Sequence, residues 1–175
     1  MTFKETKLAG VFEIEITPIV DERGFFARSW CREEFIRRGL NGTLSQSSIS
    51  FNPQRGTFRG MHWQAAPFAE AKLVRCTQGS ICDVALDLRT GSPTFKDWTA
   101  VTLSALNRRM LYIPEGCAHG FLTLQNDTEV FYQISELYNP QSGRGVRWND
   151  PAFGIQLPES VTVISKRDSS YTDFV

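Results

Sequence analysis

Two histidines give the first indication of chemistry in this sequence, because histidine is the one side chain that titrates near neutral pH unaided. The chain contains only His62 and His119, and each lies among glycine and aromatic residues, in RGMHWQ and AHGF. A lone histidine is usually structural, so the plain alternative for each is a core side chain. Their shared setting favours general acid–base catalysis, in which an imidazole takes up or returns a proton.

Lys72 and Asp83 form a second candidate pair, on either side of Gln78 and Gly79. If Gln78 and Gly79 are the centre of a two-residue hairpin, Val74 pairs with Asp83 and Lys72 becomes a diagonal neighbour of that aspartate. Strand alternation then puts both charges on one face. On an inner face they would need each other, because an unpaired buried charge is costly. The alternative is an outer face where both charges are solvated.

Tyr132 and Asp168 are further candidates. Tyr132 lies in EVFYQI, where it shares a strand face with Val130 and Ile134, so a core aromatic is the alternative to a general acid. Asp168 lies in SKRD and either orients a histidine or is a solvated loop carboxylate. The residues alone leave both choices open.

The histidine content argues against a metal centre. Jelly rolls often hold a metal on clustered histidines, but in RGMHWQ the second member of a His-x-His pair is replaced by Gln64. Two histidines far apart in the chain cannot build a site rich in imidazole ligands. We therefore expect acid–base chemistry without a metal.

The elements that must position these side chains are short β-rich runs separated by Gly, Pro, Asn and Asp. Such spacing is typical of an all-β sandwich or barrel. The runs cover residues 11–20, 23–30, 43–51, 57–64, 71–89, 98–104, 108–115, 119–125, 128–138 and 161–165. One surface helix is expected in CREEFIRRGL, where Phe35, Ile36 and Leu40 fit an apolar stripe and Gly39 can end it.

Composition narrows the class of protein. Nineteen basic and nineteen acidic residues cancel, which gives no sign of a field that would recruit nucleic acid or a membrane surface. The sequence shows no signal-like start and no long apolar run. The four cysteines lack metal or disulfide spacing and suit reduced core thiols. We expect one domain over residues 1–175, located in the cytoplasm.

Eight segments, in order, carry a resemblance to a known family: DERGFF, RGMHWQ, AKLVR, GSICDVALDLRTGSPTF, IPEGCAHGF, YNPQSG, WNDP and SKRD. Together they span residues 21 to 168, and the set resembles the dTDP-4-dehydrorhamnose 3,5-epimerase family over nearly the full chain. The resemblance implies an all-β, antiparallel jelly roll, cupin-like, with one or two short helices. It also implies that the protein needs no cofactor and forms a homodimer whose pocket residues are shared across the interface.

The resemblance implies a role for each catalytic candidate. His62 matches the base that removes a proton beside the ketone of a 4-keto-6-deoxy sugar, and Asp168 matches its carboxylate partner. Lys72 matches the residue that stabilises the enolate oxygen, where positive charge helps most. Tyr132 matches the acid that returns a proton to the opposite face, as inversion requires.

The resemblance also implies positions that bind the substrate. These are Arg23 and Arg59 at the diphosphate, where a guanidinium suits phosphate oxygens, Phe25, Gln46 and Tyr138 near the nucleotide base, and Asp83 and His119 as supporting polar groups. Strict alternation would place Arg59 and His62 on opposite strand faces. A bulge at Gly60 would reconcile the two; the alternative is that Arg59 serves the partner's site.

Three further binding positions depart from the family pattern: Arg28 replaces a glutamate, Ser48 an asparagine and Glu70 a glutamine. We expect these departures at the nucleotide end, where they change the pattern of donors and acceptors. The alternatives to a dTDP-sugar 3,5-epimerase are therefore a single-centre epimerase or ketoisomerase acting on another sugar nucleotide, such as a GDP or CDP sugar. An alternative of another class is a non-catalytic jelly roll that binds sugar nucleotides.

Overall fold

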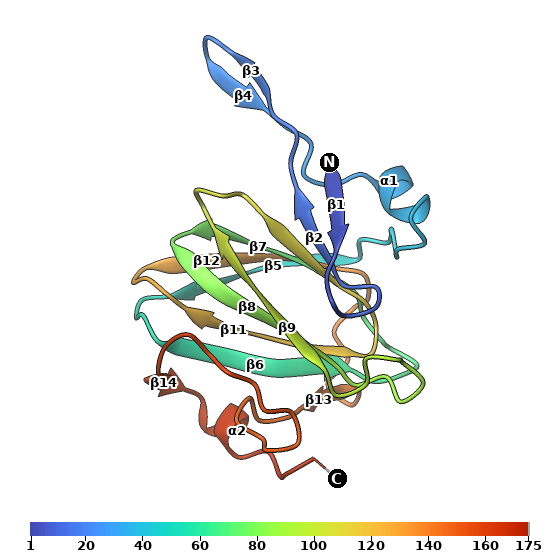
Figure 1. Ribbon diagram of the computed structural model, residues 1–175, viewed down its shortest axis with the longest axis vertical. Helices are drawn as coiled ribbons and strands as arrows, with labels where there is room; N and C mark the ends of the chain where they lie inside the picture. The colour runs from blue at the N-terminus through green and yellow to red at the C-terminus, as the bar shows by residue number, and fades with distance from the viewer. Residues whose placement is uncertain (175) are drawn as a thin grey trace.

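Two antiparallel sheets packed face to face make up the body of the protein in a computed structural model, which describes residues 1–174. The first sheet has the strand order β1-β2-β10-β7-β12-β5 and the second the order β13-β6-β11-β8-β9 (Figure 1). The strands of the first sheet are β1 (Thr2–Glu5), β2 (Phe12–Glu15), β5 (Gln46–Asn52), β7 (Lys72–Gln78), β10 (Met110–Ile113) and β12 (Thr128–Ile134). Those of the second are β6 (Thr57–Gln64), β8 (Ser80–Asp87), β9 (Trp98–Ser104), β11 (Cys117–Thr123) and β13 (Gly143–Gly145).

The remaining elements are a separate hairpin, one further short strand at the second sheet and two helices. The hairpin of β3 (Ile19–Asp21) and β4 (Gly24–Phe26) projects from the body, and the short β14 (Val163–Ile164) pairs in parallel with β6 (Figure 1). The two helices are short: α1 (Arg32–Ile36) and α2 (Lys166–Ser169). The expected antiparallel jelly roll with one or two short helices is confirmed, with that one parallel pair as its exception.

The predicted hairpin at Gln78 and Gly79 is wrong. Its two strands belong to different sheets, because β7 pairs with β10 and β12 whereas β8 pairs with β9 and β11. The chain crosses between the sheets at Gly79, whose φ is +77° and where a Cβ would lie 2.4 Å from Oγ1 of Thr128. Glycine is therefore required at position 79 because the chain passes from one sheet to the other there, and not because of a hairpin turn.

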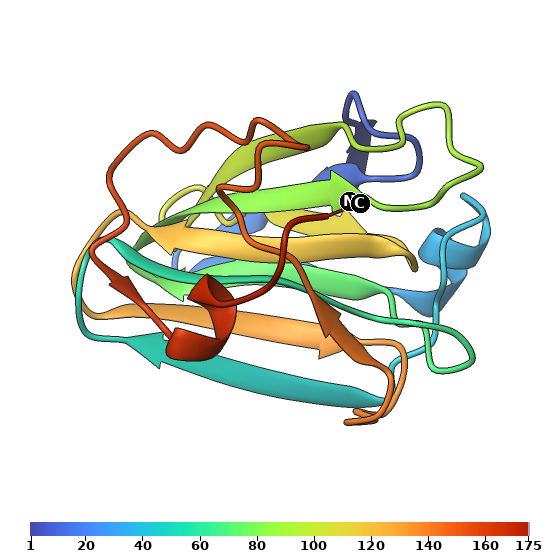
Figure 2. The ribbon, with the colours of Figure 1, turned by 90° about the horizontal axis from the view of Figure 1, so that it is seen from below.

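The alternation on each strand was nevertheless predicted correctly. Val74 and Ala85 pack together between the sheets, whereas Val84 and Leu86 lie on the outer face of the second sheet. The C-terminal segment, including Phe153, covers that outer face (Figure 2). Both faces of β8 are thus covered, which explains why all of its residues are buried.

The surface helix is present but shorter than its apolar stripe suggests. Phe35 is 1% exposed and packs in a cluster with Leu40, but Ile36 is 55% exposed and does not belong to the stripe. The helix ends after one turn, and Gly39 follows with a φ of +71°. Within residues 1–174 no helix is long and apolar enough to cross a membrane.

All four cysteines are free, as the sequence predicts. Burial raises the pKa of the Cys76 and Cys82 thiols to about 11 and that of Cys117 to about 12. These three thiols therefore stay protonated at neutral pH and serve as core side chains rather than nucleophiles.

A buried carboxylate closes the end of β8. Asp87 is inaccessible to solvent and accepts hydrogen bonds from Arg89 Nε at 2.8 Å, Thr94 Oγ1 at 2.7 Å and the Ser92 hydroxyl. Burial alone would raise the pKa of Asp87, but these bonds outweigh it and hold the pKa well below its usual range. The loop of residues 89–94 thus folds around one negative charge.

Asp87→Asn is expected to lower the free energy of unfolding by about 3 kcal/mol, because it leaves the Arg89 guanidinium without its counter-charge. Since the folded pKa is depressed, the stabilisation is present above the unfolded pKa of about 3.9 and is lost as the pH falls below it. Denaturant unfolding at pH 7 and pH 3 measures both effects, with Asp97→Asn, an exposed aspartate nearby, as the control. An equal loss at both pH values would contradict this account.

Candidate active site

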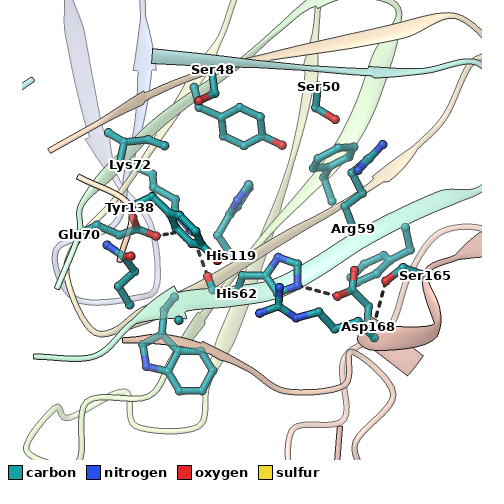
Figure 3. A pocket seen from close by; sticks show the side chains of 18 of the residues that line it. Ser48, Ser50, Arg59, His62, Glu70, Lys72, His119, Tyr138, Ser165 and Asp168 are labelled. Atoms are coloured by element: carbon teal, nitrogen blue, oxygen red, sulfur yellow. Dashed lines mark hydrogen bonds and ion pairs between the residues drawn. The ribbon is translucent and has the colours of Figure 1, made fainter. Parts of the chain in front are cut away.

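A cavity that gathers most of the candidate residues lies between the two sheets and has a volume of about 840 Å³. The first sheet contributes residues from β5, β7 and β12, and the second contributes them from β6, β11 and β13. β14 and α2, with residues such as Ser165 and Asp168, add to its wall. This placement brings together segments that are far apart in the sequence (Figure 3).

A bulge in β6 turns Arg59 and His62 toward the same cavity, as predicted. His62 pairs with His119 and Arg59 with Phe121, so two residues of β6 lie opposite Gly120 alone. Gly60 has a φ of +131°, and a Cβ at this position would lie 2.4 Å from the Gly120 Cα. Only glycine fits both the backbone angle and the close approach.

His62 and Asp168 form a hydrogen-bonded pair, with 2.7 Å between Nε2 and Oδ1 (Figure 3). The Gly60 N–H also donates to Asp168, and Ser165 caps the start of α2 by accepting from the Asp168 N–H. Burial opposes ionisation of Asp168, but the bond from His62, the imidazole charge and the Gly60 N–H together lower its pKa. Asp168 is thus a buried carboxylate that holds the imidazole, not a solvated loop residue.

Lys72 lies in the cavity but does not contact Asp83, so that part of the prediction is wrong. Its Nζ forms an ion pair with Glu70 at 3.0 Å and donates to the His62 carbonyl oxygen at 3.2 Å. β7 and β8 are in different sheets, which separates the lysine from the predicted aspartate. Glu70, which is expected at the nucleotide end, contacts Lys72 (Figure 3); its place relative to the nucleotide stays a prediction.

Asp83 forms a second pair with His119, with 2.7 Å between Oδ1 and Nε2. Asp83 is inaccessible to solvent and lies behind His119, so it does not line the cavity as expected for a residue that touches substrate. His119 lines the cavity and packs edge to face against Tyr132, with ring centroids 6.0 Å apart. The two histidines lie on the adjacent strands β6 and β11, and each has a carboxylate partner.

Tyr132 lies on β12, in the sheet opposite His62, and is the cross-strand partner of Ser48. Burial, followed by the nearby charge of Asp83, raises the pKa of the Tyr132 phenol well above its usual value. The phenol is therefore protonated at neutral pH. Ser48 and Ser50 line the same wall of the cavity (Figure 3).

The rim of the cavity is basic and aromatic. Arg59 donates from Nε to Asn52 at 2.7 Å, and the Tyr138 N–H donates to Gln46 at 3.4 Å. Two further arginines, Arg144 and Arg167, line the cavity. The sequence did not predict either of them. Arg167 lies within SKRD, where the Ser-x-x-Asp spacing is itself typical of a helix start and could have indicated a positioned arginine.

Gln64, the residue in place of a second metal-binding histidine, links two loops at the cavity. Its Nε2 donates to the carbonyl oxygens of Phe68 and Leu137, and its Oε1 accepts from the Asn139 N–H. Across residues 1–174 no three His, Cys, Asp or Glu side chains cluster where they could hold a metal ion. The absence of a metal or cofactor stays a prediction.

Arg23, Phe25 and Arg28 do not lie in the cavity of their own chain. Arg23 pairs with Asp21 at the tip of the β3–β4 hairpin, and Arg28 pairs with Glu34 at 3.2 Å. The hairpin projects away from the body (Figure 1). One chain therefore does not bring these three residues to the site.

The fold and the site define an acid–base enzyme in which a jelly roll encloses a cavity with a histidine–aspartate pair, a lysine and a tyrosine. The family model described as dTDP-4-dehydrorhamnose 3,5-epimerase matches residues 5–175. The chain belongs to this family, so the predicted resemblance is confirmed.

Individual relatives agree with this assignment. A dTDP-4-dehydrorhamnose 3,5-epimerase of Sinorhizobium fredii is 42% identical over 172 residues, covering 97% of this chain and 88% of its own. The crystal structure of the Bacillus anthracis epimerase, with TDP and PPi bound, is 37% identical with a TM-score of 0.93 and covers 99% of both chains. A Legionella pneumophila 3,5-epimerase in complex with dTDP-4-keto-L-rhamnose is 34% identical with a TM-score of 0.88, covering 96% and 89%.

Proposed function

We propose that this protein epimerises a dTDP-4-keto-6-deoxy-hexose at carbons 3 and 5. The ketone at carbon 4 acidifies the hydrogens on both neighbouring carbons, and the same base, enolate and acid sequence serves each centre. The observation that carries the proposal is the placement of His62 and Tyr132 on opposite sheets of one cavity, with Lys72 in the same wall as Tyr132. The names of the family and its relatives supply the substrate class.

His62 acts as the base. Asp168 accepts the Nε2 hydrogen, which leaves the lone pair on Nδ1 to take the proton from the sugar carbon. The imidazolium that forms gains stability from the ionised Asp168 at 2.7 Å. The carboxylate thus fixes the tautomer and supports the charge.

Lys72 stabilises the enolate oxygen. Two of its contacts, to Glu70 and to the His62 carbonyl, fix the direction of the ammonium and leave donor capacity for the substrate oxygen. The negative charge of Glu70, 3.0 Å from the Lys72 Nζ, cancels part of the field of the lysine. Among the three departures from the family pattern, Glu70 is therefore the one proposed to act on the sugar end.

Tyr132 acts as the acid. Its raised pKa keeps the phenol protonated, so it has a proton to donate. The site is reset when the phenolate takes a proton from solvent and the His62 imidazolium releases one to solvent. Donation from the sheet opposite His62 reaches the other face of the planar enolate. That geometry converts proton exchange into inversion.

The basic rim binds the nucleotide. Arg59, Arg144 and Arg167 concentrate positive charge at the cavity of a chain with no net charge, as a diphosphate requires. Gln46 and Tyr138 lie where a base can stack and hydrogen bond.

Incubation with dTDP-4-keto-6-deoxy-glucose in deuterated water tests the proposal. Mass spectrometry and NMR count the deuterium at carbons 3 and 5 and report the configuration. Deuterium and inversion at both carbons are expected. Exchange at only one carbon would indicate a single-centre epimerase. A faster reaction with a GDP or CDP sugar would show that the substrate carries another nucleotide. No exchange with any of these sugars would indicate a non-catalytic protein that binds sugar nucleotides.

We also propose a homodimer in which the β3–β4 hairpin reaches the partner's cavity. Ile19, Val20 and Phe26 on the hairpin are 71%, 76% and 76% exposed, and Ile49 and Phe51 expose 63% and 50% on the edge strand β5. Exposed apolar side chains grouped in this way are typical of protein interfaces. The arrangement would bring Arg23, Phe25 and Arg28 to a site that they cannot reach in their own chain.

Val20→Asp with Phe26→Asp is expected to convert the dimer into monomers of 19.8 kDa, because two charges cannot be buried without partners. Analytical ultracentrifugation measures the mass, and steady-state assays should show a raised KM. Ile36→Asp, an exposed apolar residue on α1, is the control. A double variant that stays dimeric would contradict this interface.

Two broader features are also part of the proposal. We propose that residues 1–175 form a single domain, supported by the two sheets that share one interior and by the C-terminal segment packed on the second sheet. We propose a cytoplasmic location, supported by four free cysteines, since such thiols persist in a reducing compartment.

A further inference from the structure

The C-terminal segment passes along the wall of the cavity and places Tyr171 beside His62. The two rings meet edge to face, with centroids 6.4 Å apart and an interplanar angle of 72°. Figure 2 shows this segment running from α2 across the second sheet. His62 therefore has a polar contact on one side, from Asp168, and an aromatic contact from Tyr171.

The ring of Tyr171 packs directly against the backbone of Gly145. Gly145 pairs directly with His62 across β13 and β6, and a Cβ on Gly145 would lie 2.2 Å from Cζ of Tyr171. No side chain can be added there without moving the ring. The absence of a side chain at Gly145 thus leaves the space that the Tyr171 ring occupies beside His62.

The hydroxyl of Tyr171 has a different partner. It accepts a hydrogen bond from Arg167 Nε at 2.9 Å, and Arg167 lines the cavity. One side chain therefore contacts both the proposed base and an arginine of the basic rim. The ring carries the first contact and the hydroxyl carries the second.

The position of Tyr171 is fixed at both ends. Asp168 precedes it and is bound to His62, whereas Phe174 follows it and donates its N–H to Asp150 at 2.8 Å. The Phe174 ring also packs on Phe153, with centroids 5.1 Å apart. Anchors three residues away on each side hold the tyrosine against the site.

We propose that Tyr171 is a positioning residue with two separable effects: its ring sets the orientation of the His62 imidazole, and its hydroxyl sets the orientation of Arg167 toward the substrate phosphates. The inference rests on the proposed function, in which His62 is the base. Loss of the ring is expected to lower the rate of proton transfer, whereas loss of the hydroxyl is expected to lower the affinity for the substrate.

Tyr171→Phe and Tyr171→Ala separate the two effects. Phenylalanine keeps the ring, so kcat should stay within about 2-fold while KM rises about 5-fold on loss of one hydrogen bond to a charged group. Alanine removes the ring as well, so kcat should fall about 10-fold, the scale of one aromatic pair. Gly145→Ala keeps the tyrosine but displaces its ring, and should also lower kcat.

Lys166→Ala, an exposed residue on α2, is the matched control and should keep both constants. The chain has two histidines, so imidazole ¹⁵N spectra can report on His62 separately. Its signals should change in Tyr171→Ala but not in Lys166→Ala. If the alanine variant unfolds, the difference between kcat and KM in Tyr171→Phe still tests the inference.

Equal loss of kcat in the phenylalanine and alanine variants would overturn the inference, as would wild-type constants in both. These results can be told apart from a failure of the proposed function by assaying His62→Ala beside the Tyr171 variants. Retention of proton exchange by His62→Ala would remove the proposed base. An inactive His62→Ala together with unaffected Tyr171 variants would remove only the role of Tyr171.

Discussion

His62→Ala is expected to lower deuterium incorporation at carbons 3 and 5 of the sugar by about 1,000-fold, within the range for loss of a general base. The cavity has no second imidazole placed to substitute, because the His119 side chain is 4% exposed, whereas the His62 side chain is 38% exposed. Loss at both carbons is expected, since one base serves both centres. Deuterium counting at early times, with saturating substrate, measures the effect.

The fold should survive this change, because His62 is only partly buried and its neighbours in β6 keep their strand pairing. Thermal melting verifies this. Asp168→Asn is the matched variant: it keeps the imidazole but loses the charge that supports it, so exchange should fall less than in His62→Ala. Near-normal exchange in His62→Ala would show that the base has been assigned to the wrong residue.

Local physical rules predicted the parts of this site that depend on one strand. Period-two alternation conflicted with two functional residues on β6, and the glycine between them resolved the conflict through a bulge at Gly60. The prediction that no His-x-His metal pair forms also depended on one segment, in which Gln64 replaces the second histidine. In both cases the side-chain direction follows from neighbours a few residues away.

The same rules failed where the outcome depended on which strands pair. Gln78 and Gly79 were correctly predicted as a change of direction, but a turn residue does not tell whether the next strand stays in the same sheet. The error moved Lys72 next to Asp83, when its partner is Glu70 two residues away on the same segment. Short-range turn chemistry therefore gave the wrong ion pair.

Residues supplied by the end of the chain were the hardest to predict. Asp168 is 106 positions from His62, and only the family resemblance favoured its pairing with that histidine over a solvated loop position. Arg167 and Tyr171 had no periodic signal, because α2 and the segment after it are too short to show one. Their contacts depend on β13 and β14 docking beside β6, which is a property of the whole fold.

Tyr132→Phe is expected to separate exchange from inversion. Loss of the phenol should slow inversion at both carbons by about 100-fold or more, the scale of a missing general acid. Proton removal by His62 does not need the phenol, so deuterium should still enter, now with retention as the base returns a solvent-derived deuteron to the same face. The phenyl ring keeps the packing against His119, so the cavity should hold its shape.

Combined mass and configuration analysis of the recovered sugar measures this separation, as the ratio of deuterium incorporated to molecules inverted. The ratio should rise in Tyr132→Phe and stay at the wild-type value in Tyr112→Phe, where the phenol lies outside the cavity and accepts from the Asn41 N–H. A parallel fall of exchange and inversion would contradict the assignment, because it would place the phenol in the step that removes the proton. The expected result follows from one feature of the fold: His62 and Tyr132 belong to different sheets, so each can reach only one face of a planar enolate held between them.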